Sequence, residues 1–439
     1  MKKLTICLIG LIAMAGVSTA KEYTLQECIE LAKKTDRSVI AARNVARIRN
    51  DGVWVGAGQF LPSVSVSGSY RKNDQGRTSP QVYSITGGVV VESPGEPART
   101  IKSYSTGVYV GYTLFDGLQN VWDYLKSRSQ KHSADYNYTA AISDLVYAVK
   151  GQYYVVLKAR RDLDVARDAV KRSEELLKLF EEKYALGSAS LSEVLKQKVQ
   201  YGTDQLTLVT ADKTLKSAVD NLAVLVGTQP GSDFDIVDME VQKEEIGDID
   251  TYIQRALAGH PGVLSARESI SSSRYGVRSA FGQYLPTLSW SFSYGWSKDS
   301  WDQIKKFGPE DHSGTISLSL QYNVFDRFSR KAAVGGAKAG LSDARATELQ
   351  TRNQVVRDVR DAHQGIKLAE ETMKVSTETE AAAKEDMDLV QAKYNLGAAA
   401  LWELLDAEVS LKTAQFNRVK AEFDYNLALA KLHNAMGEQ

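Results

Sequence analysis

Residues 288–296 read Leu-Ser-Trp-Ser-Phe-Ser-Tyr-Gly-Trp, so large apolar residues alternate with serine or glycine along the whole stretch. A period of two is typical of a β-strand that has one apolar and one polar face. The same alternation returns at 316–324 and, in weaker form, at 64–70 and 108–114. The sequence therefore predicts four strands, two in each half of the chain.

The polar faces of these segments are dominated by Ser, Thr, Gly, Gln and Asn, with no charged residue among them. A soluble antiparallel sheet, which is the alternative, usually carries charges on its wet face. Segments of roughly ten residues, apolar outside and neutral polar inside, are typical of membrane barrels that line water. Because closed barrels start at about eight strands, four strands predict a barrel shared by several chains. The connections at 71–102 and 298–313 are then predicted as outer loops.

The chain repeats itself. Residues 58–62, Gly-Gln-Phe-Leu-Pro, return as 282–286, Gly-Gln-Tyr-Leu-Pro, at an offset of 224. At an offset of 210, the pentapeptide Tyr-Thr-Leu-Phe-Asp that ends at Asp116 returns as Tyr-Asn-Val-Phe-Asp, which ends at Asp326. Lys-Tyr-Ala-Leu-Gly, ending at Gly187, likewise returns as Lys-Tyr-Asn-Leu-Gly, ending at Gly397. Each half thus has the order helix, two strands, very long helix, glycine turn and shorter helix. We predict repeats at 21–227 and 248–439, joined by an acidic linker at 228–247 that packs on the outside.

The very long helices carry apolar residues every seven positions. A heptad pattern sustained over many turns predicts a coiled coil. Glu380 interrupts the second series. The regular members are Val149, Val156, Leu163, Val170 and Leu177 in the first half, and Val359, Ile366, Met373 and Met387 in the second.

The N-terminus predicts export. Lys2 and Lys3 precede an apolar stretch, and small residues up to Ala20 form a cleavage site, so residues 1–20 are predicted to be a signal peptide. After the signal peptide the sequence has no run of about 18 apolar residues, so it predicts no transmembrane helix. After cleavage one cysteine remains, Cys28, whose apolar neighbours at helical spacing predict a buried thiol.

Catalytic and ligand-binding patterns are missing from the sequence. Lys plus Arg and Asp plus Glu both number 54, which gives nucleic acid no basic surface. The five histidines have no paired metal-ligand spacing, so we predict no metal and no cofactor. The glycine-rich run at 335–340 lacks the phosphate-loop spacing and is interpreted as a site of close helix packing. Because no nucleophile or acid/base pair stands out, the sequence predicts that the protein is not an enzyme.

The doubled order of strands and heptad helices, with Leu-Pro before one strand and Phe-Asp after the next, resembles the TolC family of outer-membrane factors. The resemblance covers nearly the whole mature chain. It implies an α+β membrane protein, a homotrimer with a shared β-barrel in the outer membrane and a long periplasmic coiled-coil α-barrel. It also implies an exit duct for efflux or type I secretion, which receives substrates from an inner-membrane pump through a periplasmic adaptor. Asp36-Arg37 departs from the Asn-Pro that the family often has there, whereas the second half keeps His260-Pro261.

The resemblance also implies functional positions. Glu403 and Asp406 match acidic residues that constrict the periplasmic mouth, and Glu193 matches a position that contacts the Tyr394 position in the closed state. A gating arginine of the family is Ala399 here, which predicts weaker closure. The positions implied to meet the adaptor are Leu186, Gly187, Ser188, Leu396, Gly397 and Ala398.

A carboxylate pair on a helix is usually only a solvated face, and a glycine turn is often only a turn. At the level of the whole chain, the alternative is a periplasmic coiled-coil adaptor or structural protein. Such a protein would explain the long helices but not four lipid-facing strands.

Overall fold

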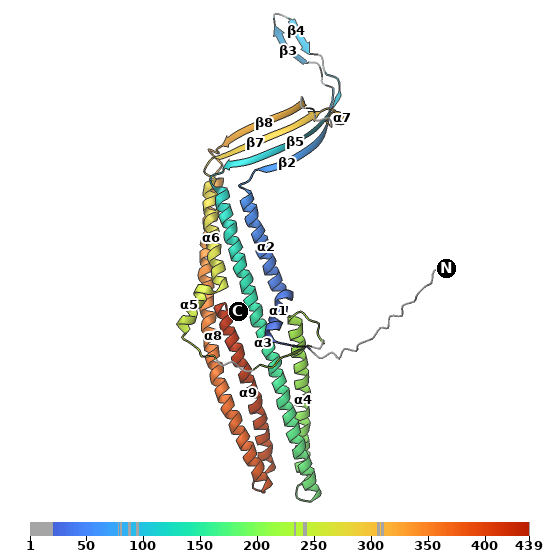
Figure 1. Ribbon diagram of the computed structural model, residues 1–439, viewed down its shortest axis with the longest axis vertical. Helices are drawn as coiled ribbons and strands as arrows, with labels where there is room; N and C mark the ends of the chain where they lie inside the picture. The colour runs from blue at the N-terminus through green and yellow to red at the C-terminus, as the bar shows by residue number, and fades with distance from the viewer. Residues whose placement is uncertain are drawn as a thin grey trace, which may run out of the picture. The chain divides into compact units, whose positions relative to one another are not determined.

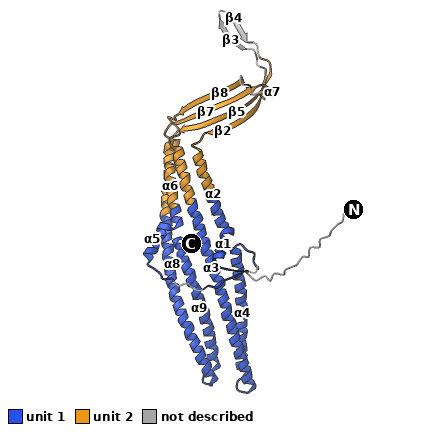
Figure 2. Cartoon of the chain, in the orientation of Figure 1, with its two compact units in different colours: residues 1–46, 134–265, 349–439 blue, residues 47–133, 266–348 orange. Residues whose placement is uncertain are grey.

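The computed structural model describes residues 21–77, 79, 81–86, 89–93, 96–231, 234–239, 244–304, 308 and 311–438. The predicted signal peptide lies outside these residues. Two compact units make up the chain (Figure 2). Unit 1 comprises residues 1–46, 134–265 and 349–439, and unit 2 comprises residues 47–133 and 266–348.

Helices dominate the chain (Figure 1). The two longest, α3 and α8, have 67 residues each. Their lengths agree with the extent of the predicted heptad helices. The helix bounds are α1 Leu25–Thr35, α2 Arg37–Gly58, α3 Gln119–Ala185, α4 Leu191–Leu225, α5 Ile249–Gly259, α6 Pro261–Gly282, α7 Trp301–Ile304, α8 Ser329–Asn395 and α9 Leu401–Met436.

Unit 2 contains an antiparallel sheet with the strand order β2-β5-β7-β8. The four predicted strands are confirmed, although the last ends at Gln321 and not at residue 324. Part of the predicted outer loop 71–102 is itself β-structure, because β2 and β5 extend into it and a separate hairpin lies between them. The strand bounds are β2 Ser63–Gln75, β3 Gln81–Thr86, β4 Val89–Ser93, β5 Arg99–Phe115, β7 Thr287–Lys298 and β8 His312–Gln321.

The sheet keeps one pairing register in both halves of the sequence. Ser63 of β2 lies opposite Gly111 of β5. By the repeat offsets of 224 and 210, Ser63 corresponds to Thr287 and Gly111 corresponds to Gln321. Thr287 of β7 and Gln321 of β8 also lie opposite each other. One apolar face runs across the sheet, and it includes the exposed side chains of Val66, Leu318 and similar residues.

The repeated Phe-Asp motif ends a strand and begins a long helix. The carboxylate of Asp116 accepts a hydrogen bond from the Asn120 N–H at 2.8 Å, and Asp326 accepts one from the Arg330 N–H at the same distance. An oxygen acceptor at this point satisfies a helix N–H that has no partner within the helix. The turn also needs left-handed backbone, and the second half places Arg327 at φ 56° where the first half has a glycine.

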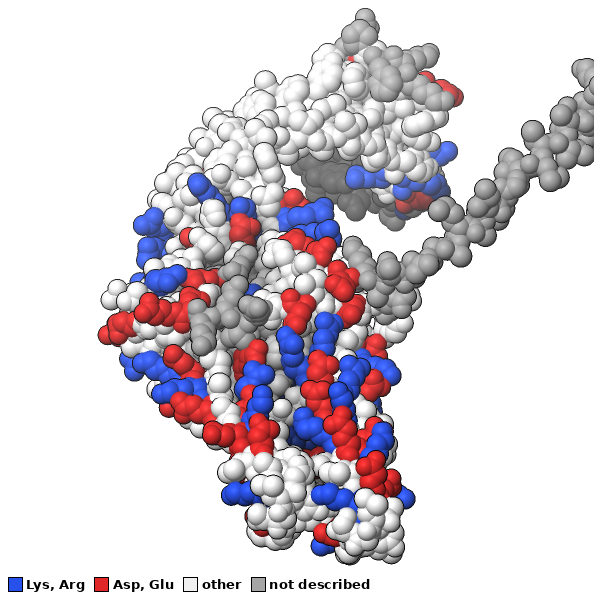
Figure 3. Space-filling model, turned by 60° about the horizontal axis from the view of Figure 1, so that its bottom comes forward, with Lys and Arg blue, Asp and Glu red and all other residues white. Residues whose placement is uncertain are grey.

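Unit 1 holds the remaining helical core. The heptad residues Val149, Val156, Val359 and Ile366 are fully buried, which confirms the predicted apolar seam. Figure 3 shows rows of mixed positive and negative side chains along its helices. Glu380, which breaks the second series, forms an ion pair at 2.6 Å with Arg418 of α9.

The predicted linker is not merely an outer segment. Strand β6 (Phe234–Ile236) pairs in parallel with β1 (Lys21–Tyr23), at the start of the described chain. Phe234 and Ile236 are buried in the same core cluster as Cys28. Burial raises the pKa of the Cys28 thiol to about 11, consistent with the predicted inert residue. Asp36 caps α2 through the Val39 N–H at 2.9 Å, so the first half breaks its helix without proline.

The interpretation of the glycine run 335–340 is wrong within the chain. A Cβ added at Gly335, Gly336 or Gly340 would meet nothing within 4 Å among the described residues. These glycines therefore face open space on α8 and do not mediate close packing inside one copy.

Candidate functional site

The two helical hairpins of unit 1, α3–α4 and α8–α9, end in matching glycine turns. Gly187 has φ 73° and Gly397 has φ 76°, a backbone conformation that favours glycine. The N–H of Ser188 donates to the Lys183 carbonyl at 2.8 Å, and the N–H of Ala398 donates to the Lys393 carbonyl at 2.9 Å. This pattern closes the C-terminus of each long helix. The predicted turns are thus present with the same geometry in both halves.

Both turns carry an exposed leucine. Leu186 is 83% exposed and Leu396 is 85% exposed, although leucine is usually buried. The glycines, Ser188 and Ala398 are also exposed. The two tips therefore offer small apolar surfaces that the described chain leaves uncovered.

Glu193 and Glu403, two of the predicted gate residues, cap the short helices. Glu193 accepts hydrogen bonds from the Ser190 N–H at 2.6 Å and the Ser190 hydroxyl at 2.9 Å, and these bonds lower its pKa. Glu403 accepts one from the Ala400 N–H at 3.0 Å. The Ser-x-x-Glu signature of a capping box at 190–193 indicates this role, which the sequence analysis missed.

The second cap is incomplete because Ala400 stands where the first half has Ser190. We expect Ala400→Ser to add the missing acceptor and to stabilise the start of α9 by about 0.5–1 kcal/mol. Ser190→Ala should destabilise α4 by a similar amount. Thermal unfolding of the purified protein, followed by circular dichroism, measures both changes. Opposite shifts are expected, and equal destabilisation by the two variants would contradict this role of the caps.

Tyr394 packs between the hairpins. Its ring centroid lies 5.4 Å from that of Phe180, and the Lys183 ammonium lies 4.6 Å from its centre. Burial raises the pKa of Tyr394, and the nearby charge of Glu193 raises it further. In the described part of the chain, however, no hydrogen bond joins the Tyr394 hydroxyl to Glu193. The structure thus brings the two residues near each other through packing and charge.

Glu403 and Asp406 share one side of α9 close to its start. Asp406 is exposed and Glu403 is half-buried. Buried apolar residues from all four hairpin helices lie beneath this region and hold the tips together. They are Leu176, Leu177, Phe180, Val194, Met387, Leu401, Leu404, Ala407 and Leu411.

A buried polar cluster further along the hairpins had no signal in the sequence analysis. Asp204 of α4 and Glu408 of α9 are each 1% exposed. The Lys412 ammonium lies 2.7 Å from an Asp204 oxygen and joins the two hairpins. Lys412 and Asp204 lie 208 positions apart in the sequence, so no local pattern indicates their pairing.

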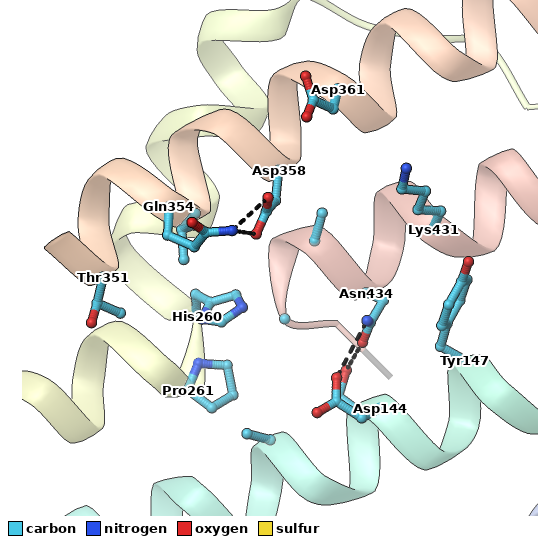
Figure 4. Close-up of a pocket in the computed structure, with 15 residues that line it drawn as sticks. Asp144, Tyr147, His260, Pro261, Thr351, Gln354, Asp358, Asp361, Lys431 and Asn434 are labelled. Carbon is cyan, nitrogen blue, oxygen red and sulfur yellow. Dashed lines mark hydrogen bonds between the residues drawn. The ribbon is translucent and has the colours of Figure 1, made fainter.

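A cavity of about 430 Å³ lies elsewhere in unit 1 (Figure 4). Its polar lining is largely paired within the protein. Asp358 accepts hydrogen bonds from Gln354 at 2.9 and 3.0 Å, and Asn434 donates to Asp144 at 3.4 Å. His260 accepts a hydrogen bond from a backbone N–H, and burial lowers its pKa. We therefore interpret the cavity as a structural junction between helices near the end of α9.

Within the described residues, no group of three or more His, Cys, Asp or Glu side chains is arranged to hold a metal ion. No helix among them is both long and apolar enough to cross a membrane.

Comparison with known proteins identifies relatives of similar length. The outer membrane protein TolC of Vibrio cholerae serotype O1 is 21% identical over 415 residues, which cover 93% of this chain and 94% of that protein. The alkaline protease secretion protein AprF of Pseudomonas aeruginosa is 20% identical over 341 residues, which cover 76% of this chain and 69% of AprF.

The fold is similar to that of the outer membrane protein VceC from Vibrio cholerae. The TM-score is 0.78 at 16% identity, with 94% of this chain and 96% of VceC covered. At this identity the likeness concerns the fold alone. The family of outer membrane efflux proteins matches residues 28–228 and 252–438, which make up most of the chain. The protein therefore belongs to the outer membrane efflux protein family.

Proposed function

We propose that three copies of this outer membrane efflux protein form a passive exit duct, which receives substrates from an inner-membrane pump through a periplasmic adaptor. The observation that carries the proposal is a four-stranded sheet with two open edges, on a chain that also forms two long helical hairpins. A channel needs no catalytic group, and the work of transport then belongs to the pump.

The open edges support a shared barrel. Strands β2 and β8 stand at the two ends of the sheet order. An open edge is unfavourable in lipid, where no water satisfies the backbone groups. Three copies with four strands each would close a barrel of about twelve strands, within the size range of membrane barrels.

The two-repeat interpretation gives this assembly a specific register. Within the chain, Tyr109 of β5 lies opposite Ser293 of β7. The offset of 210 carries Tyr109 to Ser319, and the offset of 224 carries Ser293 back to Ser69. We therefore propose that Ser319 of one copy lies opposite Ser69 of the next. This pairing sets the apolar faces of β8 and β2 on the same side of the barrel.

A glycine contact in the chain supports the same arrangement. A Cβ added at Gly282 would lie 2.7 Å from the Gly117 carbonyl oxygen, whereas a Cβ added at Gly58 would meet nothing within 4 Å in the described chain. By the repeat offset of 224, Gly58 corresponds to Gly282, and by the offset of 210, Arg327 corresponds to Gly117. In the proposed trimer, the Arg327 turn of the neighbouring copy would lie against Gly58.

We further propose that the hairpin tips form the periplasmic mouth. Three copies would place six carboxylates, from Glu403 and Asp406, around one opening, where their summed field favours cations. The Tyr394 ring would hold the closed state by packing on Phe180, with Glu193 beside it. The exposed tips at 186–188 and 396–398 would contact the adaptor.

Ion selectivity in planar bilayers tests the proposed gate. We expect Glu403→Gln combined with Asp406→Asn to lower the cation preference at least about twofold, because the opening loses its negative charge. Glutamine at 403 keeps the oxygen that caps α9, so the hairpin stays folded. The reversal potential in a potassium chloride gradient is the measurement.

Asp164→Asn is a matched control, since Asp164 is an exposed carboxylate paired with Arg167 on α3. It should leave the reversal potential unchanged. An unchanged reversal potential in the double variant would instead mean that these two carboxylates are surface residues and that the constriction lies elsewhere.

A further inference from the structure

Glu408 is a buried carboxylate without a hydrogen bond. It is 1% exposed, and neither of its oxygens accepts a hydrogen bond from the described residues. Asp204, equally buried, is satisfied by the Lys412 ammonium at 2.7 Å and by the Gln200 amide at 3.1 Å. An ionised carboxylate that is buried and unpaired is strongly unfavourable, whereas a protonated one is tolerated.

The charged groups that face Glu408 come from three helices. Asp204 of α4 raises the pKa of Glu408, while Arg172 of α3 and Lys412 of α9 lower it. Lys412 is already engaged by Asp204, and Arg172 donates to Gln415 at 3.3 Å. Burial is the largest effect, and together these causes raise the pKa of Glu408 to about 7.

The cluster lies where the two hairpins meet. Glu408 and Lys412 belong to the α8–α9 hairpin, whereas Arg172 and Asp204 belong to the α3–α4 hairpin. Any movement that separates α9 from α4 removes the groups that bury Glu408 and lets water reach it. The carboxyl would then return toward the ordinary pKa of 4.5.

We propose that Glu408 is a proton-linked latch between the two hairpins, protonated while they pack together and ionised when they separate. Asp204 and Lys412 are its positioning residues, since their ion pair fixes α4 beside α9.

The direction of the pH dependence follows from the two protonation states. The packed state binds the proton more tightly, so packing is favoured most below pH 4.5 and weakens as the pH rises toward about 7. Above that pH, Glu408 is ionised in both states and the equilibrium stays constant. The full change in the packing equilibrium is at most about 2.5 orders of magnitude, the difference between the pKa of about 7 and the ordinary pKa of 4.5.

Amide hydrogen exchange on the full-length protein in detergent tests the latch, with Glu408→Gln as the comparison. Glutamine keeps the shape of the protonated acid but cannot ionise. At pH 5 the amides of 197–215 should exchange no more than about fivefold faster in the wild type than in the variant, since Glu408 is then only partly ionised in the separated state. At pH 8 we expect them to exchange at least about tenfold faster in the wild type. Because the two proteins are compared at the same pH, the intrinsic effect of pH on the amide exchange rate is the same in both and cancels.

Equal exchange in the two proteins at both pH values would overturn the proposal, as would greater protection of the wild type at pH 8. Asp424→Asn, which changes an exposed carboxylate of α9 that pairs with Lys420, is the matched control and should behave as the wild type. Asp204→Asn provides a second variant. It removes the neighbouring negative charge and frees Lys412, so it should move the pH transition downward.

The latch does not rest on the proposed gate. The protein with Glu403→Gln and Asp406→Asn should keep the full pH dependence of exchange, whatever its ion selectivity. Loss of that dependence in the gate variant alone would assign the titration to the tip carboxylates and overturn the role of Glu408.

Discussion

Replacing Gly117 by alanine is expected to abolish folding of the sheet onto its helices, at a cost of about 3 kcal/mol or more. Gly117 has φ 74°, where an L side chain is strained. An added Cβ would also collide with the backbone carbonyl oxygen of Gly282, which cannot move as a side chain can. The two penalties act at one point, where the β5–α3 turn crosses the end of α6.

The reciprocal change, Gly282→Ala, should also be strongly destabilising. Its Cβ would lie 2.6 Å from the Gln119 side chain and 2.7 Å from the Gly117 carbonyl oxygen. Gly276→Ala is the matched control on the same helix, because its Cβ would meet nothing within 4 Å in the described chain. It should stabilise α6 by about 0.5–1 kcal/mol. The denaturation midpoint and the yield of folded protein measure all three variants. Similar stabilities for Gly282→Ala and Gly276→Ala would contradict the close crossing.

Oxidation of the variant Ser69→Cys, Ser319→Cys is expected to link the chains covalently into trimers. Directly opposed residues on neighbouring strands have Cα atoms about 4.5–5.5 Å apart, within disulfide reach. Inside one chain these positions lie on opposite edges of the sheet, three strand spacings or roughly 14 Å apart, so no internal bridge can form. The buried Cys28 thiol, with its raised pKa, does not compete. Electrophoresis without reductant should show a three-chain band that collapses to one chain on reduction.

The register has its own control. Ser69→Cys combined with Ser317→Cys keeps the polar face but moves the partner by two residues, to about 7–8 Å, beyond disulfide reach. Its linking should be weak. Equal linking by both pairs would contradict the proposed register, and a ladder of species larger than three chains would contradict the closed trimer.

The parts of the fold that sequence predicted are those with a strong period. Strand β7, with its alternation from Leu288 to Trp296, and the heptad residues of α3 and α8 were found because burial on one face repeats at a fixed interval. The glycine turns were found because Gly187 and Gly397 need a backbone conformation that few other residues adopt.

The missed features depend on contacts between distant segments or on very short elements. The pairing of β1 with β6 involves three residues on each side and leaves no periodic signal. Glu380 looked like an error in the heptad until Arg418 was brought beside it. Glu408 could not be recognised as buried, because the groups that act on it from the other hairpin, Arg172 and Asp204, precede it by some 200 residues.

The gate remains a prediction from family resemblance. The structure shows that the carboxylates of Glu193 and Glu403, which that resemblance selected, cap α4 and α9. Asp406, exposed and free of that role, is the cleaner probe of the gate.

The open edges of the sheet also affect how the protein assembles after export. Before the proposed trimer forms, β2 and β8 of a protomer pair only with β5 and β7 among the described residues, so the outer edge of each can pair with any chain that arrives first. In the proposed trimer, correct assembly needs three copies to meet in one register, whereas an aggregate needs only two copies to meet in any register. The yield of folded protein then depends on how the rate of correct association compares with the rate of aggregation, so a chaperone that shields both edges during transit would raise it.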